Sequence, residues 1–139
     1  ETLAMLAKDK KEWVREAVAS NPNALPETLE LLTEDTAKFV RGAVARNKNA
    51  PEKVFLKLAK DENSINRHYV ASNPNVPAEI LAMLASDKEV WIRFAVAGNS
   101  NTPLNALETL ADDENLRVSE KAENVLKERL IKGKCGIEK

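Results

Sequence analysis

The 139-residue chain has few of the side chains on which active sites and metal centres usually depend. It has one cysteine, Cys135, so a single chain can form neither an internal disulfide nor an all-cysteine metal site. With His68 as the one histidine, the sequence indicates no Cys–His or Ser–His–Asp catalytic set and no ordinary zinc site. Its four glycines are scattered and form no phosphate-binding loop. We therefore predict no catalytic residues, no metal, no cofactor and no enzymatic activity.

An excess of charge of one sign and long apolar runs are missing as well. The 21 lysines and arginines nearly balance the 22 aspartates and glutamates, which weighs against a dedicated nucleic-acid binder and against attraction to an anionic membrane. No apolar run approaches the roughly 18 residues of a membrane span, and no charged-then-apolar signal segment opens the chain. One cysteine favours a reducing compartment, so we expect a cytoplasmic location.

Aromatic residues make up only 4% of the chain, although 43% of the residues are hydrophobic. A core of small and branched side chains is typical of short helices that stack closely, which calls for a search for internal repeats. The sequence repeats every 26 residues, and the recurring residues are Asp9, Asp35, Asp61, Asp87 and Asp113; Arg15, Arg41, Arg67 and Arg93; Asn21, Asn47, Asn73 and Asn99; and Pro51, Pro77 and Pro103. Pro26 stands one place out of this register.

The repeat divides the chain into one repeat domain, residues 1–132, and a tail, residues 133–139, which we expect to be flexible. The predicted units are 1–24, 25–50, 51–76, 77–102 and 103–132. The last unit departs from the pattern, because Arg117 and Ser119 replace residues that the other units share. Its second helix is predicted to run from about Asn115 to Ile131, so we expect this unit to act as the C-terminal cap.

The local signals within each unit are helical, as residues 26–50 illustrate. Pro26 is a good first residue for a helix, and Leu29 and Leu32 lie one turn apart on a buried stripe. This first helix is short, and it can be α or 3₁₀.

A second helix follows in the same unit. Asp35 fits its N-cap, and Asn47 fits its C-terminal end because Asn tolerates the left-handed conformation. Its predicted core face consists of Phe39, Val40, Ala43 and Val44. Since neither helix can bury its apolar stripe alone, stacked units must share a core. We predict an all-α superhelical solenoid of about five 26-residue units, each a short α or 3₁₀ helix followed by an α-helix.

The repeated motif is L-A-x-D-x(4)-V-R-x-A-V-A-x-N-x-N-x-P, seen first at Asp9, Val14 and Arg15. Over residues 1–126 it resembles the leucine-rich repeat variant family, and it looks related to HEAT repeats. The resemblance implies a right-handed superhelix that alternates α-helices with short or 3₁₀ helices. One type of member carries a cysteine-rich iron–sulfur segment before its repeats, but this sequence lacks those cysteines, so the resemblance implies no cluster here.

Two sets of recurring polar residues allow a structural or a functional interpretation. The arginines could form a row that binds phosphates or carboxylates. We favour a structural ladder in which each arginine pairs with an aspartate of its own or an adjacent unit, since the two residue types recur together. The asparagines could read bases or peptide groups, but we expect them to close turns and satisfy buried backbone groups.

Positions that vary between units are the candidates for recognition. On the second helix, three positions one turn apart, such as Lys38, Gly42 and Arg46, lie opposite the predicted core face, and we expect folding to leave them free to vary. From this stripe we select as candidate partner-binding residues Glu16, Lys38, Arg46, His68, Val90 and Phe94. An alternative for Phe94 is that it packs under the last unit.

The function that we predict is a non-catalytic scaffold for protein–protein interaction through these variable positions. The partner is a protein or peptide whose identity the sequence does not give. The alternative is binding to a DNA or RNA backbone by a HEAT-like solenoid, against which the net charge of −1 weighs. A third expectation is self-association through the first unit, in which Glu1 already falls inside a helix and no polar capping unit precedes it.

Overall fold

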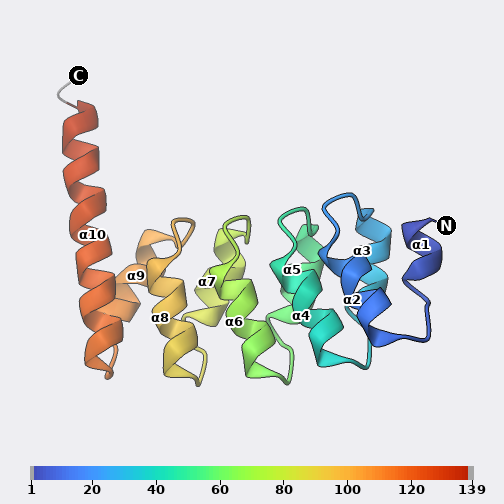
Figure 1. Ribbon diagram of the computed structural model, residues 1–139. Helices are drawn as coiled ribbons and strands as arrows, with labels where there is room; N and C mark the ends of the chain where they lie inside the picture. Colours follow the sequence, from blue (N-terminus) through green and yellow to red (C-terminus); the bar gives the residue numbers. More distant parts are fainter. Residues whose placement is uncertain (1, 138–139) are drawn as a thin grey trace.

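The computed structural model describes residues 2–137 and, from residue 134 onward, only their backbone. This part of the chain contains ten α-helices and no strand, arranged as successive helix pairs (Figure 1). The helices are α1 (Leu3–Leu6), α2 (Glu12–Ser20), α3 (Pro26–Leu32), α4 (Lys38–Arg46), α5 (Glu52–Leu58), α6 (Ser64–Ser72), α7 (Ala78–Leu84), α8 (Val90–Gly98), α9 (Leu104–Ala111) and α10 (Leu116–Ile137). The short first helices, for which the sequence left α and 3₁₀ open, are therefore α-helical.

The helices form two layers. The second helices of the units, α2, α4, α6, α8 and α10, each pack against the next, and the first helices lie behind them (Figure 1). The second helices begin at Glu12, Lys38, Ser64, Val90 and Leu116, which is every 26 residues. The arrangement is an all-α solenoid, as the repeat predicted.

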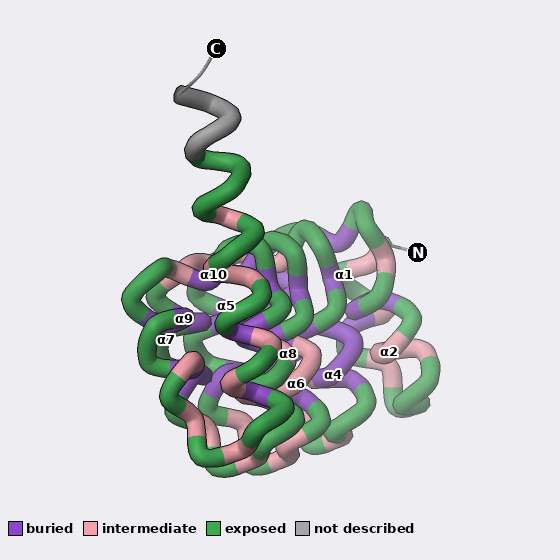
Figure 2. The backbone as a smooth tube through the Cα atoms, turned by 90° about the vertical axis from the view of Figure 1, so that its left-hand side faces the viewer, coloured by how far each residue is buried: buried purple, intermediate pink, exposed green. Residues whose placement is uncertain are grey.

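The core lies between the two layers and is shared by neighbouring units (Figure 2). In the first helices the buried side chains are mainly leucines such as Leu29 and Leu81, with Phe55 in α5. In α2, α4, α6 and α8 a valine followed by an alanine is buried in every unit, as in Val44 and Ala45. Small residues here let consecutive second helices approach closely, which is why so few aromatic residues are needed.

Two local predictions for the second helix were wrong. Phe39 is 61% exposed and so does not belong to the core face, although Val40, Ala43 and Val44 are buried as predicted. The N-cap of α4 is Ala37, not Asp35. Asp35 lies two residues earlier, where its Oδ1 accepts the N–H of Ala37 at 2.9 Å and turns the chain into the helix.

The reason given for the end of the second helix was also wrong. Asn47 is the C-cap of α4, but its backbone is extended, with φ −70° and ψ 122°. No residue in the described part of the chain, glycines included, has positive φ. Instead, the Oδ1 of Asn47 accepts the N–H of Asn49 at 2.9 Å, which directs the chain away from the helix axis.

The C-terminal helix α10 packs on both α8 and α9. It continues beyond Ile131, the predicted end, to Ile137 and projects past the rest of the solenoid (Figure 1). Arg129 ties it to the preceding unit by donating hydrogen bonds to the carbonyl oxygens of Thr102 at 2.6 Å and Ser100 at 3.0 Å. Residues 133–137, which we assigned to a flexible tail, are thus helical, and residues 138–139 lie outside the described residues. None of the described helices is both long and apolar enough to span a membrane.

A candidate partner-binding face on the second helices

Each recurring arginine donates hydrogen bonds to the aspartate of the next unit, 20 residues later. The four pairs are Arg15 with Asp35, Arg41 with Asp61, Arg67 with Asp87 and Arg93 with Asp113, with Nε to Oδ2 distances of 2.7, 2.7, 2.8 and 2.7 Å. In each pair Nη2 also donates to Oδ1, so the pairing is bidentate. The Nη1 of each arginine donates to the backbone carbonyl of its own unit's aspartate, for example Arg41 to Asp35 at 2.9 Å. These bonds connect consecutive units at one edge of the solenoid.

The pairing shifts the pKa of the aspartates. The Arg93 guanidinium holds the pKa of the Asp113 carboxyl below its ordinary value, although partial burial acts in the opposite direction. For Asp35, Asp61 and Asp87 burial is the largest single influence and raises the pKa, but the hydrogen bonds from arginine and from a backbone N–H together outweigh it. All four carboxylates therefore stay ionised at neutral pH, and the arginines that they engage do not form a free row for phosphates.

The recurring asparagines link the units in a second place. The amide of Asn73, a buried side chain, donates to the carbonyls of Ala45 at 2.8 Å and Asn47 at 3.3 Å in the preceding unit. Asn47 and Asn99 make the same two bonds one unit earlier and one unit later. These side chains satisfy carbonyls at the ends of the neighbouring second helices, so their role in the structure is to hold the stack together.

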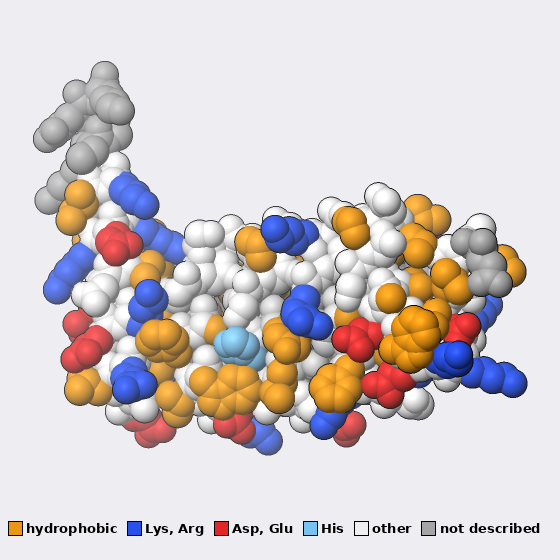
Figure 3. All heavy atoms as spheres, viewed as in Figure 1, with side chains coloured by type: hydrophobic (Ala, Val, Ile, Leu, Met, Phe, Trp, Pro, Cys, Tyr) orange, Lys and Arg blue, Asp and Glu red, His pale blue; other side chains and the backbone are white. Residues whose placement is uncertain are grey.

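Exposed apolar side chains form a row at the second position of successive second helices. The row, called here the apolar row, consists of Trp13, Phe39, Ile65 and Trp91, which are 67%, 61%, 53% and 39% exposed. Figure 3 shows hydrophobic side chains gathered along the face that α2, α4, α6 and α8 share. Folding does not require large apolar groups at these positions, since none of them is buried in the core.

The sequence analysis missed the apolar row because it placed Phe39 on the core face. A usable signal was present, however. At about 100° per residue, the second position of the helix lies beside the ninth, and the ninth residues Ser20, Arg46, Ser72 and Gly98 are polar or small. A residue that points in nearly the same direction from the helix axis as a polar residue belongs to the exposed side of the helix.

The structure divides the six predicted partner-binding residues between exposed and half-buried positions. Lys38, Arg46, Val90 and Phe94 are exposed, whereas Glu16 and His68 are partly buried. The His68 ring lies 5.2 Å from the Trp91 ring, and this burial lowers the pKa of His68. The Arg46 guanidinium lies 4.8 Å from the centre of the Tyr69 ring on the next helix. Two of the candidates thus lie against members of the apolar row, His68 against Trp91 and Lys38, whose ammonium lies 5.4 Å from the centre of the ring, against Phe39.

Gly42, which belongs to the same variable stripe, is determined by packing and is not free to vary. A Cβ atom at Gly42 would lie 2.6 Å from the Oδ1 of Asn66 and 3.3 Å from the Tyr69 ring. Asn66 cannot easily move away, because its amide donates to the carbonyl of Lys38 at 3.0 Å. The expectation that folding leaves the whole stripe open was therefore wrong at this position.

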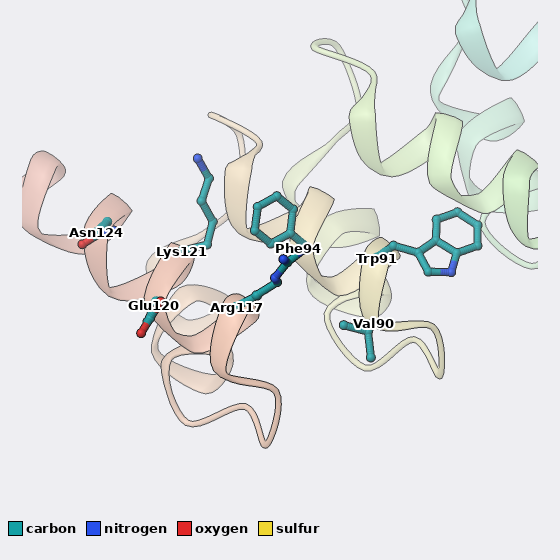
Figure 4. Close-up of a pocket in the computed structure, with 7 residues that line it drawn as sticks. All are labelled: Val90, Trp91, Phe94, Arg117, Glu120, Lys121 and Asn124. Atoms are coloured by element: carbon teal, nitrogen blue, oxygen red, sulfur yellow. The ribbon is translucent and has the colours of Figure 1, made fainter.

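A pocket of about 520 Å³ lies at the end of the apolar row, between α8 and α10. Val90, Trp91 and Phe94 line it from α8, and the α10 side is lined by Arg117, Glu120, Lys121 and Asn124 (Figure 4). Phe94 is 42% exposed, so the last unit covers it only in part. The ammonium of Lys121 lies 5.9 Å from the centre of the Phe94 ring. The pocket therefore combines an apolar wall with a charged one.

The described residues include no group of three or more His, Cys, Asp or Glu side chains that could hold a metal ion. What the site offers chemically is apolar contact area, flanking charges and a pocket, which are the components of a recognition surface.

Comparisons with known proteins give a likeness in structure and none in sequence. No family model matches the sequence, and no curated protein matches it. The structure is similar to a solved structure described as a leucine-rich repeat variant with a novel repetitive protein structural motif, at 24% identity and a TM-score of 0.46. The match covers 87% of this chain, which spans 58% of the length of the solved one. The solenoid fold itself rests on the helices and contacts described above.

Proposed function

We propose that the protein is a non-catalytic scaffold that binds a protein or peptide partner through the apolar row. The observation that carries this proposal is the exposure of Trp13, Phe39, Ile65 and Trp91 along one face. Contiguous exposed apolar surface is unfavourable in water and marks interaction sites. Tryptophan and other large side chains also contribute most of the binding free energy where proteins meet.

A rigid frame supports the same function. The arginine–aspartate pairs and the asparagine amides fix the distance between consecutive units, so the members of the apolar row are held in register before any partner binds. Nucleic-acid binding is less favoured, because the four recurring arginines already donate to aspartates. A cytoplasmic location is part of the proposal, since a chain with one cysteine does not depend on an oxidising compartment.

Site-specific photo-crosslinking tests the proposal. Benzoylphenylalanine replaces Phe39 in one variant and Leu104 in a matched control. Leu104 is 56% exposed and lies on α9, the first helix of the last unit. In extract from the native host we expect discrete crosslinked proteins from the Phe39 position that are absent at the Leu104 position. Equal crosslinking from both positions, or none from Phe39, would refute the proposal, and crosslinks to nucleic acid would favour the alternative.

A further inference from the structure

We infer that the apolar row binds an extended segment in the polyproline-II conformation, with an apolar side chain at every third residue and a carboxylate at the α10 end. This inference rests on the proposed function and names the class of partner. It follows from the spacing of the row, its width and the charges at its two ends.

The spacing of the row matches one conformation of an extended chain. Packed helices lie about 8–10 Å apart, and the apolar row supplies one side chain per second helix. A polyproline-II segment advances about 9.3 Å every three residues and returns its side chains to the same side at that interval. A β-strand presents side chains on one side every ~6.7 Å, which falls out of step with the helices. Each triplet of a polyproline-II segment can therefore contact one member of the row.

The row is also narrow, which favours an extended partner over a helical one. In α4 the residues one turn after Phe39, Gly42 and Ala43, are buried, and the exposed ninth residue is Arg46, so the apolar surface there is one side chain wide. An α-helix about 10–12 Å in diameter would place much of its apolar stripe on this polar neighbour. Aromatic rows of this kind suit the polyproline-II conformation, which costs little entropy to order.

Charge distinguishes the two ends of the row. At the second position of α10 the apolar series is replaced by Arg117, and Lys121 lies one turn further. Among the described residues neither forms an ion pair, and in Figure 4 the Glu120 carboxylate points away from α8. At the opposite end both signs of charge are present, since Glu12 and Glu16 lie on α2 and the Lys11 ammonium lies 5.9 Å from the centre of the Trp13 ring. A carboxylate on the partner is therefore favoured beside α10, where Arg117 and Lys121 lie without a neutralising partner among the described residues.

The pocket between α8 and α10 completes the site. Its apolar wall, Val90 with Phe94, adjoins the last apolar member of the row, Trp91. An apolar side chain of the partner can enter there while the following carboxylate meets Arg117 and Lys121 on the other wall. The pocket thus fixes the register of the segment on the row.

Intrinsic fluorescence gives a direct assay, because the two tryptophans of the protein, Trp13 and Trp91, both belong to the row. The probe is a synthetic acetylated peptide of four Leu-Pro-Pro triplets followed by two glutamates. One control peptide has the same composition, but its four leucines alternate with single prolines and the remaining prolines follow before the two glutamates. A second control replaces the two glutamates with lysines. We expect a saturable fluorescence change with the probe and at least about tenfold weaker binding of both controls.

Two variants assign the binding to the row and to its basic end. Ile65→Ala removes a member of the row without touching a tryptophan, and we expect the Kd of the probe to rise about fivefold. The matched control Leu104→Ala, on the other helix layer, should leave the Kd unchanged. The double variant Arg117→Ala, Lys121→Ala should raise the Kd of the probe about tenfold and remove its salt dependence, and it should not weaken binding of the lysine control peptide. Thermal melts of all variants verify that the fold is kept.

The outcomes separate this inference from the proposed function. Equal binding of the two leucine registers, or a helical circular dichroism signal from the bound peptide, overturns the inference. Absence of any peptide binding, while crosslinking from Phe39 still captures a partner, also overturns it and leaves the proposed function standing. If crosslinking from Phe39 fails as well, the proposed function fails with it.

Discussion

Replacing Arg67 with alanine removes one rung of the arginine–aspartate ladder. Arg67 is the most buried of the four arginines, with a side chain 9% exposed against 7% for its partner Asp87. It donates from Nε to Asp87 at 2.8 Å, from Nη2 to Asp87 at 3.3 Å and from Nη1 to the Asp61 carbonyl at 2.9 Å. After the substitution, the Asp87 carboxylate keeps only the N–H of Glu89 at 3.0 Å.

The expected cost is large for a single substitution. Removing one partner of a buried ion pair costs about 3–5 kcal/mol, because the remaining charge stays desolvated. Both side chains of this pair keep a solvent-exposed edge, so we expect about 3 kcal/mol of unfolding free energy to be lost. For a chain of this length that corresponds to a fall in Tm of about 10 °C.

Urea denaturation followed by circular dichroism measures this change. Arg67→Lys keeps the charge but not the planar bidentate geometry, so it should recover less than half of the loss. Arg46→Ala is the matched control, because Arg46 is exposed, forms no ion pair among the described residues and lies over the Tyr69 ring, and it should cost less than about 1 kcal/mol. If the unfolding free energy of Arg67→Ala stays within about 1 kcal/mol of the wild type, or falls no more than that of Arg46→Ala, the ladder does not stabilise the stack.

Three further predictions concern acid, a glycine and an asparagine. The pKa of Asp113 and of the three equivalent aspartates is lowered in the folded state, so the stabilisation that they give is complete above the ordinary aspartate pKa of about 3.9 and is lost as pH falls through the folded pKa. The urea concentration at the unfolding midpoint should therefore stay constant from pH 7 to 5 and fall below about pH 4. A midpoint that does not change with pH would contradict the pairing. Gly42→Ala should lower the unfolding free energy by about 1–3 kcal/mol, since its Cβ would meet Asn66, and an unchanged or raised Tm would show that the helices can separate at no cost. Asn73→Ala should lower the unfolding free energy by about 2–3 kcal/mol, because it leaves two buried carbonyls unpaired. The control is Asn21→Ala, which should cost about 1 kcal/mol or less, because the Asn21 amide meets no acceptor among the described residues. Equal losses for the two variants in chemical denaturation would show that the asparagine amides do not hold the units together.

The sequence predicted the fold well because its signals are local and repeated. Leucine at turn spacing and the valine–alanine pair define the buried stripes, and a stripe that recurs every 26 residues requires stacked units. The candidate site was predicted only in part. Phe39 was assigned to the wrong face because its neighbour Val40 is buried, and a short apolar run does not say where the buried sector of a helix ends.

Local sequence was equally unable to predict which surface positions neighbouring units occupy. Gly42 looked like a variable surface residue, but Asn66 from the next unit fills the space above it. Asp35 looked like a helix cap, yet it lies two residues before the N-cap of α4. There its carboxylate accepts the N–H of Ala37 and a hydrogen bond from the guanidinium of Arg15. The atoms of Asn66 above Gly42 and the guanidinium of Arg15 at Asp35 both come from a different unit, at a distance along the chain that no helical period encodes.

The sequence by itself therefore determined the period, the helix pair within each unit and most residues of the core, because burial largely follows from apolar spacing along one helix. Only the tertiary structure decided that each arginine pairs with the aspartate of the following unit, and that Trp13, Phe39, Ile65 and Trp91 form one exposed row. The physical reason is that both depend on how far and at what angle one unit is displaced from the next. That displacement is set by close packing between helices of different units, which the spacing of residues within a unit does not specify.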